Sequence, residues 1–112
     1  MSSFDAVVTV VRGVTRVVLR GELDLASVPV LERELAPIEE AGPAGLELDL
    51  RGLTFIDSTG LRAILGADER ARRQGRELRV LPGPEPVHRV FRITGLDRRL
   101  RFVEAGPGGD PS

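Results

Sequence analysis

The sequence predicts an α/β domain whose mixed β-sheet, of about five strands, carries its helices mainly on one face. Two β-branched runs joined at Arg12-Gly13 open the chain as a hairpin, and segments of helical and strand periodicity then alternate. Right-handed crossovers between parallel strands connect such segments. Residues 46–51 alternate strictly between leucine and charged residues, whereas a strand covered on both faces is apolar throughout. We therefore expect the second face of the sheet to be largely open.

The first half of the chain contains the hairpin, one helix and the alternating strand. The hairpin covers residues 7–19. A helix follows before the loop at residues 42–45, because aliphatic side chains recur at helical spacing, namely Val28, Leu31, Leu35 and Ile38. Ser27 is the candidate N-cap of this helix, and Pro37 is expected to bend it or end it near its last turn.

The second half adds two helix–strand pairs. The first helix starts at Leu61 and stops at Gly75. Its apolar stripe is Leu61, Ile64, Leu65 and Ala71, and its polar side is Arg62, Asp68, Glu69 and Arg72. A strand over 78–80, a helix from Val87 to Gly95 and a strand over 100–103 complete a single domain, residues 1–105. Residues 106–112 are rich in proline and glycine, and we expect them to be disordered.

Composition excludes several classes of protein. A chain of 112 residues, 41% hydrophobic and 29% charged, has the composition of one soluble globular domain. The absence of cysteine rules out disulfides, thiolate metal sites and a cysteine nucleophile. No signal peptide is visible, and no run approaches the ~18 apolar residues of a membrane span. We therefore expect a cytoplasmic protein that does not act at a membrane.

The charges are distributed unevenly along the chain. Residues 1–61 contain five arginines and ten acidic residues, a net charge of −5, whereas residues 62–112 contain eleven and seven, a net charge of +4. Such polarity can steer a charged protein partner. Direct nucleic-acid binding is not expected, because the arginines are interleaved with acids and only 4% of the residues are aromatic. All sixteen basic residues are arginine, which we interpret as genomic composition bias.

The most informative segment is Asp57-Ser58-Thr59-Gly60, between the alternating strand and the next helix. Unpaired N–H groups and the positive end of the helix dipole tolerate an anion there, so a hydroxyl at this point can carry a phosphate. The plainer interpretation is capping, because Asp, Ser and Thr are common N-caps. One such side chain is enough for a cap, however, and this segment has three. Phe55 and Ile56, directly before it, add apolar surface suited to recognition.

Residues 49–61, Asp-Leu-Arg-Gly-Leu-Thr-Phe-Ile-Asp-Ser-Thr-Gly-Leu, resemble the signature of STAS domains, specifically the small bacterial anti-sigma-factor antagonists. Residues 21–24, Gly-Glu-Leu-Asp, and residues 94–97, Thr-Gly-Leu-Asp, resemble two further markers of that family. The resemblance spans residues 4–104. It implies a STAS-like fold and a role in transcription regulation by partner switching.

The resemblance also implies roles for individual residues. Ser58 is the implied phosphorylation site, with Asp57 beside it in recognition and proton handling. Thr59 is the second choice, because its β-branch suits a buried or capping position. The expected partner-binding residues are Glu22, Asp24, Phe55, Ile56, Asp57, Ser58, Thr59, Gly60 and Arg62. Arg62 stands where some close antagonists have glycine, and it would either pair with a phosphate or carboxylate or be solvated surface.

The implied partners are two enzymes. The unphosphorylated antagonist binds an anti-sigma factor that is also a GHKL-type serine kinase, and the phosphorylated antagonist releases it. A PP2C-type phosphatase then removes the phosphate. No cofactor and no metal are expected.

The same residues allow three alternative functions. Ser58, His88 and either Asp57 or Asp49 are the residue types of a serine hydrolase, but no Gly-x-Ser-x-Gly elbow is present and His88 lies in a predicted helix, so we do not expect an enzyme. No Walker motif occurs, although the helix start could bind a nucleotide weakly. The serious alternative is a STAS adaptor subunit of a lipid-transport ABC complex, without phosphorylation switching.

Overall fold

The computed structural model describes residues 3–104 and contains one five-stranded sheet whose strands lie in chain order. The elements are β1 (Phe4–Val11), β2 (Val14–Leu23), α1 (Val28–Ala41), β3 (Gly45–Ile56), α2 (Ser58–Arg73), β4 (Glu77–Leu81), α3 (Glu85–Thr94), a 3₁₀ helix (Leu96–Arg98) and β5 (Arg101–Phe102). β1 is antiparallel to β2, and each later pair is parallel. The predicted mixed α/β sheet is confirmed. The predicted tail, residues 106–112, lies outside the described residues.

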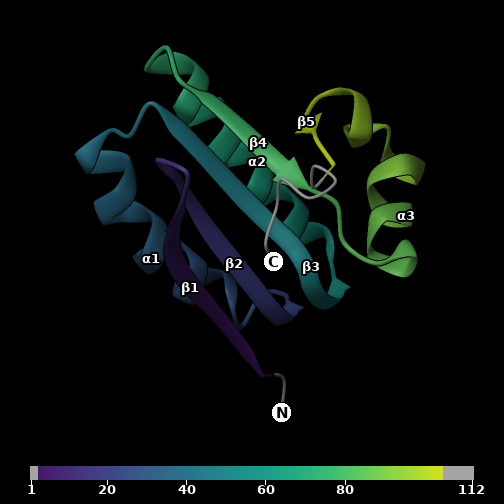
Figure 1. The fold of residues 1–112 in the computed structure, drawn as a ribbon. Coiled ribbons are helices and arrows are strands. Elements are labelled where there is room, and N and C mark those ends of the chain that lie inside the picture. The colour runs from purple at the N-terminus through teal and green to yellow at the C-terminus, as the bar shows by residue number, and fades with distance from the viewer. Residues whose placement is uncertain (1–2, 105–112) are drawn as a thin grey trace.

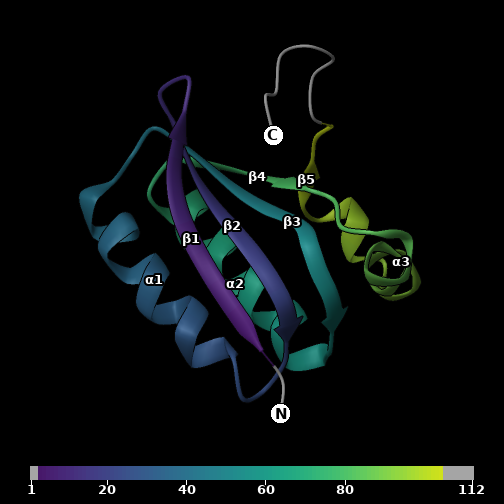
Figure 2. The same cartoon turned by 60° about the horizontal axis from the view of Figure 1, so that its bottom comes forward.

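The helices lie mainly on one face of the sheet, as predicted. α1 and α2 pack against that face, and α3 lies at the β4–β5 side (Figures 1 and 2). Strand residues such as Val17, Leu48 and Val80 join residues from all three helices in one buried cluster. Each fully buried aliphatic side chain contributes roughly 1.5–3 kcal/mol relative to an exposed one.

The predicted hairpin turn is present at Arg12-Gly13. Both residues have positive φ, 53° and 81°, which is the conformation of a two-residue type I′ turn. Val11 therefore lies opposite Val14, and this register brings Ala6 opposite Leu19.

Pro37 lies inside α1. The helix continues past Pro37 to Ala41, where Gly42 adopts φ 72° and donates its N–H to the Ile38 carbonyl at 3.0 Å. Pro37 therefore does not end the helix, which was one of the two effects predicted for it. Pro37 is on the exposed side of the helix, while buried Leu35 and Ile38 hold the last turns on the sheet.

α2 buries one charged residue that was predicted to be solvated. Leu61, Ile64 and Ala71 are buried as expected, but Asp68 is only 5% exposed. Its carboxylate is 2.9 Å from Arg72 Nε. Burial disfavours the charged form and raises the pKa of Asp68, although the charge of Arg72 opposes this. Hydrophobic periodicity does not predict the burial of Asp68, because a charged residue that is buried in an ion pair is counted as part of the polar side.

The region after α3 differs from the predicted strand over residues 100–103. α3 ends at Gly95, φ 77°, as predicted, but a 3₁₀ turn follows it and β5 has only two residues. The Val103 N–H still donates to the Val80 carbonyl at 2.9 Å, so the pairing with β4 extends slightly beyond the strand.

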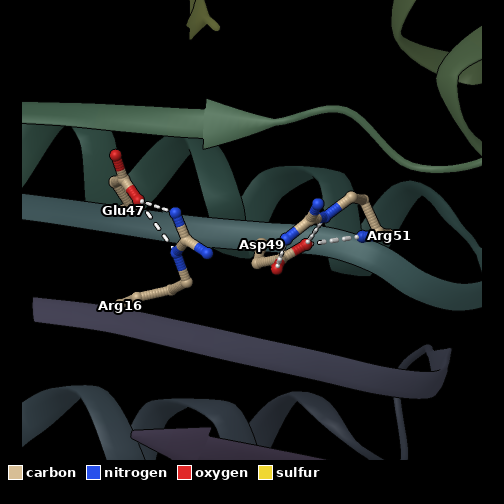
Figure 3. Close-up of polar contacts among 4 residues, drawn as sticks. All are labelled: Arg16, Glu47, Asp49 and Arg51. Atoms are coloured by element: carbon tan, nitrogen blue, oxygen red, sulfur yellow. Dashed lines mark hydrogen bonds and ion pairs between the residues drawn. The ribbon is translucent and has the colours of Figure 1, made fainter. Parts of the chain in front are cut away.

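The second face of the sheet carries paired charges (Figure 3). Arg16 from β2 donates to Glu47 Oε1 at 2.9 Å, and both side chains are largely buried, with exposed fractions of 6% and 12%. Asp49 accepts from Arg51 Nη2 at 2.8 Å and from the Arg51 backbone N–H at 3.0 Å. Burial opposes ionisation of Asp49, but the hydrogen bonds from Arg51 outweigh it and hold its pKa below the usual value. The charged side chains of β3 therefore lie on the face opposite the helices, as predicted, but in pairs.

Candidate functional site

The candidate site lies where the carboxyl ends of β2 and β3 meet the start of α2. Glu22 is opposite Phe55 and Leu23 is opposite Ile56 in the parallel register. The Asp57 N–H also donates to the Leu23 carbonyl at 3.2 Å. Residues 21–24 and residues 55–60, which are more than 30 positions apart in the sequence, are therefore adjacent in the fold.

Asp57 caps α2. Its backbone is extended, with φ −109° and ψ −176°, and its Oδ1 accepts the Gly60 N–H at 2.9 Å. The Asp57 carbonyl accepts the N–H of Leu61 at 2.9 Å and starts the helix. The capping function that was the plainer interpretation of this motif thus belongs to Asp57.

Ser58 is the first residue of α2, and it is exposed. Its hydroxyl makes no hydrogen bond with any of residues 3–104, and neither does the hydroxyl of Thr59, which is partly buried. Because Asp57 already provides the cap, neither hydroxyl is needed for helix stability. Ser58 is the more accessible of the two.

Gly60 and Ile56 are buried under this surface. A Cβ on Gly60 would lie 2.7 Å from the Leu23 carbonyl oxygen and 2.9 Å from Ile56 Cγ1. Only glycine lets α2 start this close to the end of β2. Both residues were predicted to bind a partner, and the structure places them beneath the surface, whereas Phe55 is 48% exposed.

The loop after β2 is fixed by Asp24 and Ser27. The Ser27 hydroxyl donates to the Glu22 carbonyl at 2.7 Å and accepts the Asp24 N–H at 2.8 Å. Asp24 Oδ1 in turn accepts the Ser27 N–H at 3.1 Å. Ser27 occupies the N-cap position of α1 without making a side-chain cap bond. Glu22 and Asp24, both predicted site residues, are partly buried and lie at the rim.

Sequence reasoning missed Leu25, which is 72% exposed. Leu25 and Phe55 are thus two exposed apolar side chains near the carboxyl ends of β2 and β3, the end of the sheet at which Ser58 lies. The available signal was its place outside the helical stripe, directly after Asp24. Arg62, one turn into α2, is exposed and forms no ion pair within residues 3–104.

His88 is not arranged for hydrolase chemistry with Ser58. Its ring lies against Phe102 and Phe91, at centroid distances of 4.8 and 6.2 Å. It makes no hydrogen bond with Ser58, Asp57 or Asp49 in the part of the chain that the structure describes, and its buried Nδ1 has no partner there.

Comparison with known proteins decides the family. Residues 5–105 match the family model of the STAS domain. The chain belongs to the STAS domain family. A curated relative, the anti-sigma-B factor antagonist of Bacillus subtilis (strain 168), is 35% identical over 91 residues, which cover 81% of this chain and 83% of the relative.

Solved STAS domains have the same fold. An anti-sigma factor antagonist from Mycobacterium paratuberculosis superposes with a TM-score of 0.81 at 25% identity, over 98% of this chain and 87% of that one. The anti-sigma factor antagonist SpoIIAA in its unphosphorylated form gives 0.67 at 25% identity, over 90% and 88% of the two chains.

Two further properties of this STAS domain bear on its site. Within residues 3–104, every helix is too short or too polar to cross a membrane. The same residues contain no group of three or more histidine, aspartate or glutamate side chains placed to hold a metal ion.

Proposed function

We propose that this STAS domain is an anti-sigma-factor antagonist of the cytoplasm that binds an anti-sigma factor through the surface around Ser58. The partner is a GHKL-type serine kinase, and phosphorylation of Ser58 releases it, so that sigma-factor-dependent transcription is regulated. The observation that carries the proposal is an exposed serine with an unpartnered hydroxyl at the start of a helix that Asp57 already caps. The names of the curated relatives support the same role.

The proposed modification is a phosphoryl transfer. Ser58 Oγ forms a new bond to the γ-phosphorus of ATP, the bond from that phosphorus to the bridging oxygen breaks, and ADP leaves. The hydroxyl proton passes to a base, for which the adjacent Asp57 carboxylate is our candidate. A PP2C-type phosphatase hydrolyses the phosphate ester and restores the hydroxyl.

Electrostatics explain why the phosphate would weaken binding without unfolding the domain. The group adds about −1.5 to −2 charges next to Asp57 and close to the loop that holds Glu22 and Asp24. The start of α2 offsets this in the free domain by about 0.3–1 kcal/mol. When a partner covers the same surface, water no longer screens the added charge. The exposed Ser58 side chain has no intramolecular hydrogen bond to lose.

The neighbouring side chains fit a protein partner. Leu25 and Phe55 offer apolar area beside Ser58, and interfaces combine such area with a polar rim. Glu22, Asp24 and Arg62 would form that rim.

The test uses the anti-sigma factor kinase of the same organism with four forms of the domain. We expect wild type and Ser58→Ala to bind it, Ser58→Asp to bind at least about tenfold more weakly, and Thr59→Ala to behave as wild type. With ATP, only the two forms that keep Ser58 should accept phosphate. Circular dichroism should be the same for all four.

Two results would contradict this function. Phosphate incorporation into Ser58→Ala would place the acceptor elsewhere. Affinity capture in which wild type and Ser58→Asp retain the same ABC ATPase would favour the adaptor alternative.

A further inference from the structure

A hollow of about 420 Å³ lies at the C-terminal end of α2, where α2, β4, the 3₁₀ helix and β5 meet. It is lined by five arginines, Arg72, Arg76, Arg98, Arg99 and Arg101. The lining includes only two acidic residues, Asp68 and Glu77, so its formal charge is +3 when both are ionised. This is a strongly cationic concavity in a chain whose net charge is −1.

Three of these arginines are held in place by other groups. Arg72 contacts Asp68 at 2.9 Å and donates to the Arg99 carbonyl at 2.6 Å. Arg76 donates to the Glu39 carbonyl at 3.0 Å. Arg101 is 2.7 Å from Glu77. Backbone and carboxylate partners thus fix three cationic groups around the hollow.

Arg98 and Arg99 are exposed, and their guanidinium groups form no hydrogen bond or ion pair with any of residues 3–104. Both acids of the lining are already engaged. Asp68 is paired with Arg72, and Glu77 is shared between Arg101 at 2.7 Å and Arg79 at 3.0 Å. Arg99 interacts with the charge of Asp68 at longer range, but neither of the two remaining guanidinium groups is held in an ion pair within residues 3–104.

The arrangement has an electrostatic cost. Arg79 pairs with Arg101 in the parallel β4–β5 register, and a single carboxylate, that of Glu77, has to balance both charges. A bound anion would offset this excess of positive charge.

Helix stabilisation explains only part of the cluster. Of the five lining arginines, Arg72 lies in the last turn of α2, where cations interact favourably with the helix dipole. Arg98, Arg99 and Arg101 lie in the 3₁₀ helix, directly after it and in β5, so they gain nothing from that dipole. Stabilisation of α2 therefore does not explain why segments far apart in the sequence place arginines around the same hollow.

The lining indicates the kind of ligand. Guanidinium groups bind phosphate oxygens through paired hydrogen bonds. The hollow contains only two leucines beside its charged residues and no aromatic ring, so it offers little for a base to stack on or for a protein partner to bury. We propose that this hollow is a binding site for a short polyphosphate chain, either free or carried by a nucleotide.

This inference goes beyond the proposed function and is independent of it. The hollow lies at the opposite end of α2 from Ser58, and 16 helical residues span about 24 Å. A domain that is never phosphorylated at Ser58 could still bind polyphosphate here.

The test is calorimetric titration of the whole chain with sodium tripolyphosphate, ATP, sulfate and octaglutamate at constant ionic strength. Arg98→Gln/Arg99→Gln removes the two unpartnered charges. Arg33→Gln/Arg89→Gln is the matched control, because it removes two exposed arginines elsewhere that form no ion pair or hydrogen bond within residues 3–104. We expect saturable binding of tripolyphosphate that weakens about tenfold or more in the first variant and by less than about twofold in the control. Tighter binding of ATP with the same dependence on Arg98 and Arg99 would identify a nucleotide as the source of the phosphates.

Amide NMR shifts locate the site. Tripolyphosphate should shift residues near Asp68, Arg98 and Arg99 and leave residues 58–61 unchanged. The proposal is overturned if binding does not saturate or if both double variants weaken it equally. It is also overturned if the shifts fall at the start of α2, or if octaglutamate binds as tightly as tripolyphosphate.

Discussion

At the level of single residues, Asp57, Ser58 and Gly60 have separate functions within one turn. Asp57 accepts the Gly60 N–H, Gly60 permits the close approach of α2 to β2, and Ser58 is left exposed. The cap and the glycine are structural requirements, and they hold the hydroxyl in a fixed place. A recognition site benefits from that rigidity because less conformational entropy is lost on binding.

Gly60→Ala tests the close approach. The added Cβ would lie 2.7 Å from the Leu23 carbonyl oxygen, so we expect the free energy of unfolding to fall by roughly 1–3 kcal/mol in urea titrations. Gly66→Ala in the same helix is the control. Its Cβ would meet only the flexible end of Arg70, at 3.2 Å, and it should raise stability by about 0.5–1 kcal/mol. Equal effects of the two substitutions would show that the contact with β2 is unimportant.

The residues of the site were partly predictable. Ser58, Asp57 and Phe55 follow from a polar motif placed between an alternating strand and an amphipathic helix. The burial of Ile56 and Gly60 depends on how closely α2 approaches β2, which no local pattern encodes. Leu25 was missed for a related reason, because an apolar residue in a loop is as often buried as exposed.

At the level of elements, glycines define the helix ends better than proline does. Gly42, Gly75 and Gly95 all have positive φ and end α1, α2 and α3 where the sequence predicted a stop or shortly after it. Pro37 did not end α1, because the buried side chains on both sides of it keep the last turns packed on the sheet. Tertiary packing thus outweighed the local preference of proline to end a helix. In the same way, it buried Asp68, which the local pattern placed on the solvent side of α2.

Pro37→Ala should therefore stabilise the domain. The alanine restores the N–H that proline lacks and removes the ring from the helix interior, and we expect a gain of roughly 1–3 kcal/mol in the free energy of unfolding. Pro29→Ala, in the first turn of the same helix, is the matched control. Proline is well accommodated in a first turn, so this change should be neutral or slightly destabilising. Thermal denaturation of both variants separates the two cases, and a loss of stability in Pro37→Ala would contradict this explanation.

At the level of the whole molecule, chain order becomes spatial order. The strands lie in the sequence β1-β2-β3-β4-β5, and the chain runs across the sheet from one side to the other (Figure 1). Among residues 3–104, the uneven charges of the two parts of the chain, −5 over residues 3–61 and +5 over residues 62–104, are therefore also separated in space. A molecule whose net charge is −1 consequently has an acidic side and a basic side.

Ion-exchange chromatography tests this separation. At about 0.01 M ionic strength the screening length is about 30 Å, comparable to the 33 Å length of the molecule, so each side acts on a resin separately. We expect retention on both anion and cation exchangers at pH 7. Arg98→Gln/Arg99→Gln should elute earlier from the cation exchanger only, and Glu32→Gln/Glu40→Gln earlier from the anion exchanger only. Retention on the anion exchanger alone would mean that net charge governs the behaviour.

The strand order also has a consequence for how the domain forms during translation. Each strand pairs with the strand made just before it, so a segment leaving the ribosome finds its neighbour already synthesised. The β1–β2 hairpin emerges first, and β3 can join its β2 edge once α1 has been made. No strand pairs first with a strand made much later, and no strand is inserted between two that are already paired. We infer that this domain can assemble progressively from its N-terminus, with the short β5 as the final strand to be added.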